Sequence, residues 1–204
     1  MAESKNTGDR SKILLHFKSA QSNNELIDNL DIGGMDFSFL DLSEIMVDRL
    51  QAQKANFRAT VLMNVSFRDC DFDKANFDSC NMQEADIADC FFNQANFRHA
   101  YMERAKIAIS FCSGACFDEV NLNNAILVGS SFDNASFINA NLSSVDAKNA
   151  VFRNADLRGT DLTNGDFEEA DFTNAKLDGV KWKGANIKGA IFDEIYKTKI
   201  EELI

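Results

Sequence analysis

The sequence has no proline, two histidines and a single tryptophan among its 204 residues. Because proline is one of the residues that form β-turns, its absence argues against a fold built from ordinary hairpins. No run of about 18 apolar residues occurs, so no helix is expected to span a membrane. Near the N-terminus, the apolar residues 13–15 are followed by His16 and Lys18. This stretch is too short for a signal peptide, and no export signal is expected.

Cysteine is also scarce, and its spacing matches no known metal site. The five residues are Cys70, Cys80, Cys90, Cys112 and Cys116. An odd number of mid-chain cysteines is typical of reduced thiols that serve as small apolar side chains. We therefore expect a soluble, cytoplasmic protein with no metal.

Positive charge is limited, with 21 Lys and Arg against 32 Asp and Glu, which gives a net charge of −11. This balance argues against direct binding to nucleic acid or to an anionic membrane. The excess is uneven: residues 24–90 hold 14 acids and 5 bases, whereas residues 91–204 hold 16 acids and 12 bases. The N-terminal half of the chain therefore carries most of the negative charge.

Motifs of catalysis are missing as well. The sequence contains no His-Glu-x-x-His, no Gly-x-Gly-x-x-Gly, no Walker loop and no nucleophile elbow. We expect a protein that is not an enzyme and that holds no cofactor.

A period of five residues runs through most of the chain. Every fifth residue from Ile32 to Phe192 is apolar, 33 positions in all. Two residues earlier, from Ala55 onward, every residue of a second column is Ala, Cys, Val, Ser, Thr or Gly. Five fits neither the period of a helix nor that of a strand, so the chain must turn once in each repeat. The large and the small columns are both predicted to point inward.

A second period of 20 indicates that four repeats make one coil. Phe72, Phe92, Phe132, Phe152 and Phe172 fall on side one, with Cys112 among them. Side two carries a second series of phenylalanines, and sides three and four are mainly aliphatic. Residues 20 apart should therefore stack. Such stacking leaves a Cys70–Cys90 disulfide as an alternative to two reduced thiols, and it predicts a ladder of amides at Asn134, Asn154 and Asn174.

Individual repeats carry a recognisable motif. Residues 75–79 read Ala-Asn-Phe-Asp-Ser, and residues 155–159 read Ala-Asp-Leu-Arg-Gly. The sequence resembles the pentapeptide repeat family, whose units follow Ala-(Asp/Asn)-(Leu/Phe)-X-X. The resemblance implies an all-β fold, a right-handed quadrilateral parallel β-helix, which would have about eight coils here. Asp and Asn before the central residue are expected to bond backbone amides of the turn.

Three segments follow from this pattern. Residues 1–29 are predicted to form a polar segment with a helical cap over residues 9–20, residues 30–194 the β-helix, and residues 195–204 a short helix. The caps are expected because a solenoid ends in unpaired backbone groups. Family resemblance also implies that the C-terminal segment can make a homodimer.

Two functional hypotheses remain open. The first is a rigid surface for protein–protein interaction, with a partner that the sequence does not identify. The alternative comes from the resemblance: a DNA mimic that modulates a type II topoisomerase, DNA gyrase, in the manner of quinolone-protection proteins.

Most residues outside the two inward columns are polar, and the few apolar exceptions suggest where a partner binds. Phe91 and Phe111 occupy an outward position on side one, 20 residues apart, and Ile109, Ile126 and Val128 are expected nearby. The same columns carry an acidic cluster one coil earlier, and that cluster comprises Asp69, Asp71, Asp73 and Asp89. An apolar centre beside carboxylates is typical of a protein-binding surface. The alternative is that another part of the chain covers the patch.

Overall fold

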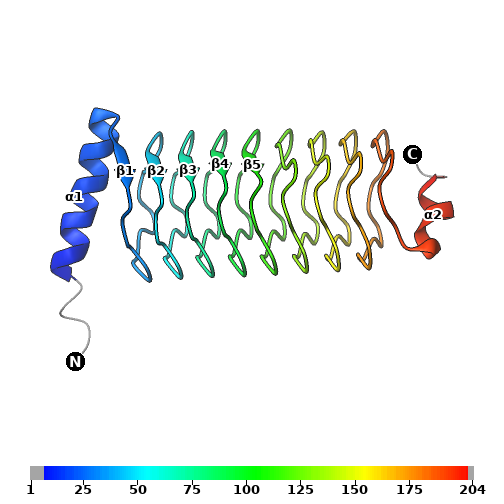
Figure 1. The fold of residues 1–204 in the computed structure, drawn as a ribbon, viewed down its shortest axis with the longest axis horizontal. Coiled ribbons are helices and arrows are strands. Elements are labelled where there is room, and N and C mark those ends of the chain that lie inside the picture. The colour runs from blue at the N-terminus through cyan, green and yellow to red at the C-terminus, as the bar shows by residue number, and fades with distance from the viewer. Residues whose placement is uncertain (1–6, 202–204) are drawn as a thin grey trace, which may run out of the picture.

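The computed structural model describes residues 7–201 and shows a rod of stacked coils between two helices (Figure 1). Helix α1 (Thr7–Asn23) lies across one end, and helix α2 (Glu194–Glu201) lies at the other. The named strands are β1 (Leu26–Asp28), β2 (Met46–Asp48), β3 (Ser66–Arg68), β4 (Asp86–Ala88) and β5 (Lys106–Ala108). None of the described helices is long and apolar enough to cross a membrane.

Neighbouring coils pair in parallel, with each residue opposite the residue 20 positions later. Strands β1 to β5 make four such steps, beginning with Leu26↔Met46, and form one five-stranded sheet. Isolated bridges with the same register run on each side as far as Asp171↔Ile191. A register of 20 residues from Leu26 to Ile191 corresponds to just over eight coils. The prediction of a four-sided parallel β-helix is confirmed.

The core is the interior of the rod, where the two apolar columns are buried. On side two, Phe57, Phe77, Phe97, Phe117 and Phe137 form one stack with ring centroids 4.7–4.9 Å apart. Phenylalanines of side one meet this stack edge to face, as the T-shaped pairs at adjacent corners show. The rings fill the space, so the other inward column accepts only small residues.

Each corner is made by a residue with a left-handed backbone, two positions after the central residue. These corners repeat from Asn24 to Gly189, and only seven of them are glycine. Ala59, for example, has φ 54°, and the amide of Thr60 donates to the carbonyl of Phe57 at 3.1 Å. A turn with one left-handed residue per repeat explains how a chain without proline turns 90° so often.

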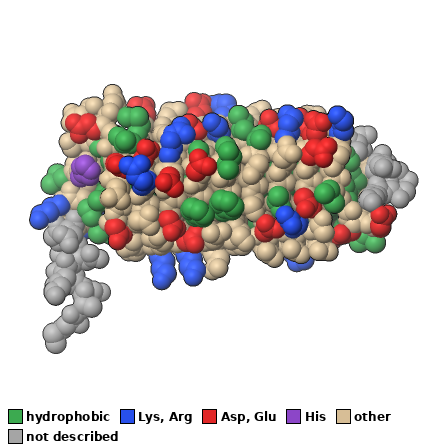
Figure 2. Space-filling view, in the orientation of Figure 1, with side chains coloured by type: hydrophobic (Ala, Val, Ile, Leu, Met, Phe, Trp, Pro, Cys, Tyr) green, Lys and Arg blue, Asp and Glu red, His purple; other side chains and the backbone are tan. Residues whose placement is uncertain are grey.

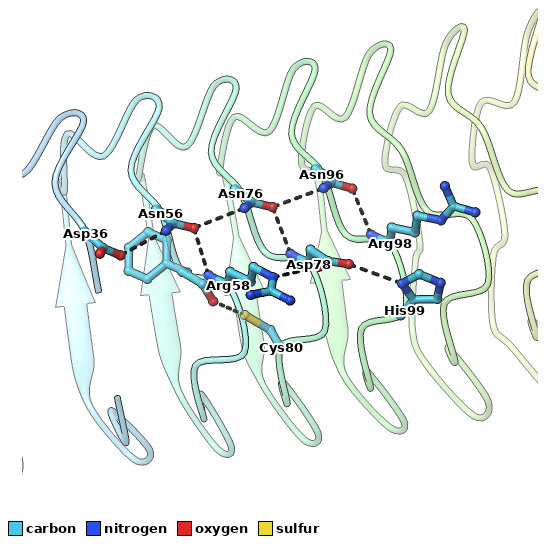
Figure 3. Close-up of polar contacts among 10 residues, drawn as sticks. Asp36, Asn56, Arg58, Asn76, Asp78, Cys80, Asn96, Arg98 and His99 are labelled. Atoms are coloured by element: carbon cyan, nitrogen blue, oxygen red, sulfur yellow. Dashed lines mark hydrogen bonds and ion pairs between the residues drawn. The ribbon is translucent and has the colours of Figure 1, made fainter. Parts of the chain in front are cut away.

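Outward Asp and Asn side chains hold these turns (Figure 3). The Oδ1 atom of Asn76 accepts from the amide of Asp78 at 3.1 Å, while its Nδ2 donates to Asn56 at 3.0 Å. Asn96 donates in turn to Asn76 at 3.1 Å. The amide ladder therefore lies on the column before the central residue of side two.

The ladder predicted at Asn134, Asn154 and Asn174 is wrong. These three residues occupy left-handed corners, with φ 56–59°. Asparagine adopts that conformation with little strain. No side-chain bond joins them within the described chain, and their spacing reflects the corner conformation.

The two ends differ in how they are covered. Phe17 and Ala20 of α1 are buried, and the Phe17 ring meets Phe37 at 5.3 Å. The coils begin at β1, four residues before the expected residue 30. In α2, Ile200 is buried whereas Ile195 is exposed. The last three residues of the helix expected over residues 195–204 lie outside the described residues.

Candidate functional site

An exposed apolar patch interrupts the polar surface of side one, at the corner where the chain arrives from side four. We call the five residues Phe91, Phe111, Ile109, Ile126 and Val128 the apolar corner patch. Phe91 and Phe111 are 41% and 48% exposed, and Ile109 is 62% exposed. Ile126 is also exposed, while Val128 is half-buried. Figure 2 shows hydrophobic side chains among the charged residues on one face of the rod.

Parallel pairing brings the patch together. Phe91 and Phe111 are bridge partners on adjacent coils, and their rings stack with centroids 5.3 Å apart and planes at 11°. The amide of Ile109 meets the carbonyl of Val128 at 3.4 Å. Ile126 is the bridge partner of Lys106, at the start of β5. These side chains therefore come from neighbouring coils.

Ile109 is strained. Its φ is 51°, a conformation that a β-branched side chain rarely adopts. The corners below it in the same column are Asp69 and Asp89, and the corner above is Gly129. Strain of this kind costs on the order of 1–3 kcal/mol and concentrates at functional sites.

The backbone at this corner also differs from later corners. After β1 to β5 the chain bends without the turn hydrogen bond, whereas from Leu127 onward the bond is present, as in Ser130 N to Leu127 O at 3.2 Å. Inside the rod, Ser110 Oγ accepts from the Cys90 amide at 3.2 Å, and Ser130 Oγ accepts from the Ser110 amide at 3.1 Å. Buried hydroxyls therefore fix the corner that carries Ile109.

The acidic cluster divides into two pairs. Asp71 accepts from the Asp73 amide at 2.9 Å, and the Asp73 carboxylate accepts from the amide and side chain of Asn93 at 2.9 and 3.0 Å. Asp69 and Asp89 are exposed corners that make no side-chain bond or ion pair with any described residue. The carboxylates of Asp71 and Asp73 are therefore used in hydrogen bonds that hold the coil together. Only Asp69 and Asp89 present free carboxylates beside the patch.

Ion pairs are fewer among the acidic residues of the N-terminal half of the rod than in the later coils, which increases the difference in charge between the two halves. Of the 14 acids in residues 24–90, four pair with a cation in the described chain: Asp28, Asp78, Glu84 and Asp86. In the later coils many acids meet a cation one coil away, as Asp161 meets Lys181 at 3.0 Å. Free negative charge therefore lies on the half of the rod that ends at the patch.

The interior offers no reactive centre among the described residues. Cys70, Cys80, Cys90 and Cys112 are free and buried, so the disulfide alternative is not realised in the structure. Burial raises the pKa of the Cys80 thiol to about 12. No group of three His, Cys, Asp or Glu in residues 7–201 is arranged to hold a metal ion.

Two further aromatic side chains are exposed outside the predicted patch. Phe39 occupies a left-handed corner with φ 61° and is 69% exposed, and the guanidinium of Arg58 lies 5.6 Å from its ring centroid. Tyr101 is exposed on side three. A large residue two positions after the central one was the available signal for Phe39.

The geometry defines a class: a repeat protein whose interior is filled and whose chemistry lies on its outer surface. A family model for the pentapeptide repeat region matches residues 115–199, and a model for pentapeptide repeats (8 copies) matches residues 51–78 and 75–108. The chain belongs to the pentapeptide repeat family. No curated protein matches it in sequence.

Solved structures of the same fold include two trypsin-treated variants of QnrB1, described as a plasmid-mediated fluoroquinolone resistance protein. One is 25% identical over 87% of this chain and 88% of the other, with a TM-score of 0.67. The second is 24% identical over 87% of each chain, with the same TM-score. These likenesses support the fold over nearly the whole rod.

Proposed function

We propose that the chain is a non-enzymatic protein that binds another protein through the apolar corner patch. The observation that carries the proposal is the exposed stack of Phe91 and Phe111, two rings in contact on a mostly polar surface. Contiguous apolar surface with a polar rim is characteristic of binding sites. Burying the exposed part of each ring would contribute about 1 kcal/mol, so the stack acts as an anchor within a larger contact.

The surrounding charge selects the partner. Asp69 and Asp89 remain free for a cation of the other protein, and the acidic half of the rod adds long-range attraction. Charges at the rim of an interface mainly affect the rate of encounter and its dependence on salt. We therefore expect a partner with a hydrophobic cleft flanked by Lys or Arg.

The test combines a covalent probe with a matched pair of variants. A photo-crosslinking amino acid in place of Ile126, an exposed residue of the patch that none of the variants changes, should label one protein in a lysate. The double change Phe91→Ser and Phe111→Ser should abolish capture of that protein without changing the circular dichroism of the coil. Tyr101→Ser alters an exposed aromatic at the corresponding position on side three, 55% exposed, and should leave capture intact. Equal capture by all three proteins would place the binding surface elsewhere.

A second candidate function is modulation of a type II topoisomerase by imitation of DNA. The structural likeness to QnrB1 favours it, since that protein confers fluoroquinolone resistance. At a strand spacing of about 4.8 Å the rod is about 40 Å long, and its net charge corresponds to about one per 3 Å, against about one per 1.7 Å of duplex DNA. Ion pairs in the later coils confine the imitation to the N-terminal half.

A gyrase supercoiling assay separates the two candidates. A DNA mimic should inhibit supercoiling or protect the enzyme from a quinolone, and charge-reversing changes at Asp69 and Asp89 should weaken either effect. No change in supercoiling and no protection at micromolar concentrations would remove the second candidate and leave the first intact.

A further inference from the structure

The two-ring stack of Phe91 and Phe111 ends abruptly at the next coil. The bridge partner of Phe111 on that side is Ser131, whose side chain is too short to cover the ring. Within the described residues, Phe91 is the only aromatic ring that stacks on Phe111, and no guanidinium lies over it. One face of Phe111 is therefore available at the level of Ser131.

A carboxylate borders this face. Ser131 Oγ donates to Asp133 Oδ2 at 2.7 Å, which holds the carboxylate next to the serine. Arg153 approaches the other oxygen of Asp133 at 3.7 Å but lies closer to Asp171, at 3.2 Å. Asp133 therefore keeps bonding capacity for a second donor.

The chain itself shows what such a combination binds. Near the N-terminal end, the guanidinium of Arg58 lies 5.6 Å from the ring centroid of the exposed Phe39. Its Nε donates to Asp78 at 3.2 Å. Ring, guanidinium and carboxylate thus come from successive coils. Phe111 and Asp133 offer the same two groups, a ring and a carboxylate, but here the carboxylate lies on the coil directly after the ring and the chain supplies Ser131 and no cation there.

We propose that Phe111, Ser131 and Asp133 form a seat for an arginine side chain of the protein partner. The inference rests on the proposed function and names one group that the partner must present. A guanidinium is planar, so it continues the stack on Phe111 while its N–H groups reach Ser131 and Asp133. Lysine has no plane to stack and offers a weaker fit.

Charge supports this occupant. Residues 24–90 carry 14 acids and 5 bases, and the free carboxylates of Asp69 and Asp89 lie on the corner column that leads to Ile109. A basic segment of the partner would lie along this column while its arginine stacks on Phe111. An acidic or neutral segment would not be attracted by the negative electrostatic potential of these carboxylates.

The test uses the full chain with 4-fluorophenylalanine in place of Phe111 and follows the ¹⁹F resonance. N-acetyl-arginine methylamide is titrated first, and N-acetyl-lysine methylamide second, at constant ionic strength. We expect a saturable shift with arginine and an affinity at least about threefold weaker for lysine. Equal affinity for the two amides would overturn the inference.

Two variants test the assignment to this seat. Ser131→Phe extends the stack by one ring, and the core stacks show that rings at this spacing fit. This change should abolish the arginine-dependent shift. Ser136→Phe alters an outward serine at the same repeat position on side two and should leave the shift unchanged. Asp133→Asn should weaken binding severalfold without filling the seat. A shift that survives Ser131→Phe in a folded protein would refute the seat.

These experiments distinguish failure of the arginine seat from failure of the proposed protein binding through the patch. If the Phe91→Ser and Phe111→Ser protein loses its crosslinked partner while no arginine preference is found, the patch binds protein but the seat is refuted. If both capture and arginine binding are insensitive to the patch, both fail.

Discussion

The inward register of the small column is tested most directly by enlarging Ala95. Ala95 is buried, and its counterparts 20 residues before and after are Ala75 and Ala115. The rings of Phe92 and Phe97, the central residues before and after Ala95, meet with centroids 5.3 Å apart, so we expect a longer side chain at position 95 to collide with the packed interior. Leucine adds three carbons, and excess atoms in a filled core cost about 1–3 kcal/mol. Since three are added at once, we expect about 3 kcal/mol.

Urea denaturation followed by circular dichroism measures this cost. With m-values of about 1–3 kcal/mol/M, Ala95→Leu should lower the midpoint by about 1 M or more. Arg98→Ala is the control, because its side chain is exposed and its ion pair with Glu119, at 3.0 Å, joins two half-exposed groups. Such a pair contributes at most about 1 kcal/mol. Equal midpoint shifts for the two variants would refute the assigned register.

Three further changes test the coil and its ends. Asn76→Ala removes the bonds to Asn56, Asp78 and Asn96 and should lower the free energy of unfolding by about 1–3 kcal/mol, measured by the same titration. Deletion of residues 195–204 should expose the last coil and increase binding of an apolar dye. If these residues also join two chains, the mass in solution should halve. An unchanged dye signal would contradict the prediction that these residues cover the last coil. Hydrogen bonds from Ser38 and Ser43 lower the pKa values of Asp36 and Asp41 below 3.8. The contribution of these two carboxylates to the free energy of unfolding should therefore be constant above that pH and decrease as the pH falls below it. A urea midpoint that does not change between pH 5 and pH 2 would contradict this.

Most of the fold could be predicted because the period of five constrains every residue in the same way. A central apolar residue such as Phe97 has one inward direction, and a shift of one position would expose it. The start of the coils at β1 escaped prediction because Glu25, two residues before the buried Ile27, breaks the column of small residues. The next members of that column, Leu30, Met35 and Leu40, are larger than the usual Ala. Helix α1 covers this end and leaves room for larger side chains there.

The site was predictable in position but not in detail. The outward location of Phe91 and Phe111 follows from the period alone. The separate roles of Asp71 and Asp89 do not, since their hydrogen bonds depend on which position of the turn each residue occupies. The sequence pattern places all four acids together, and only the backbone shows that one pair is committed to the coil.

The position of the patch is connected with a change in the coil itself. From β1 to β5 the corner leaving side four is a bend without the turn bond, and the last of these corners is Ile109. Ser110 and Ser130 provide the hydroxyls that satisfy the Cys90 and Ser110 amides at this transition. A strained isoleucine next to two exposed phenylalanines weakens the isolated rod, and most corners of the chain use Asn, Gly or a charged residue instead. Because stability alone would favour those residues, the apolar corner supports the proposed contact with a partner.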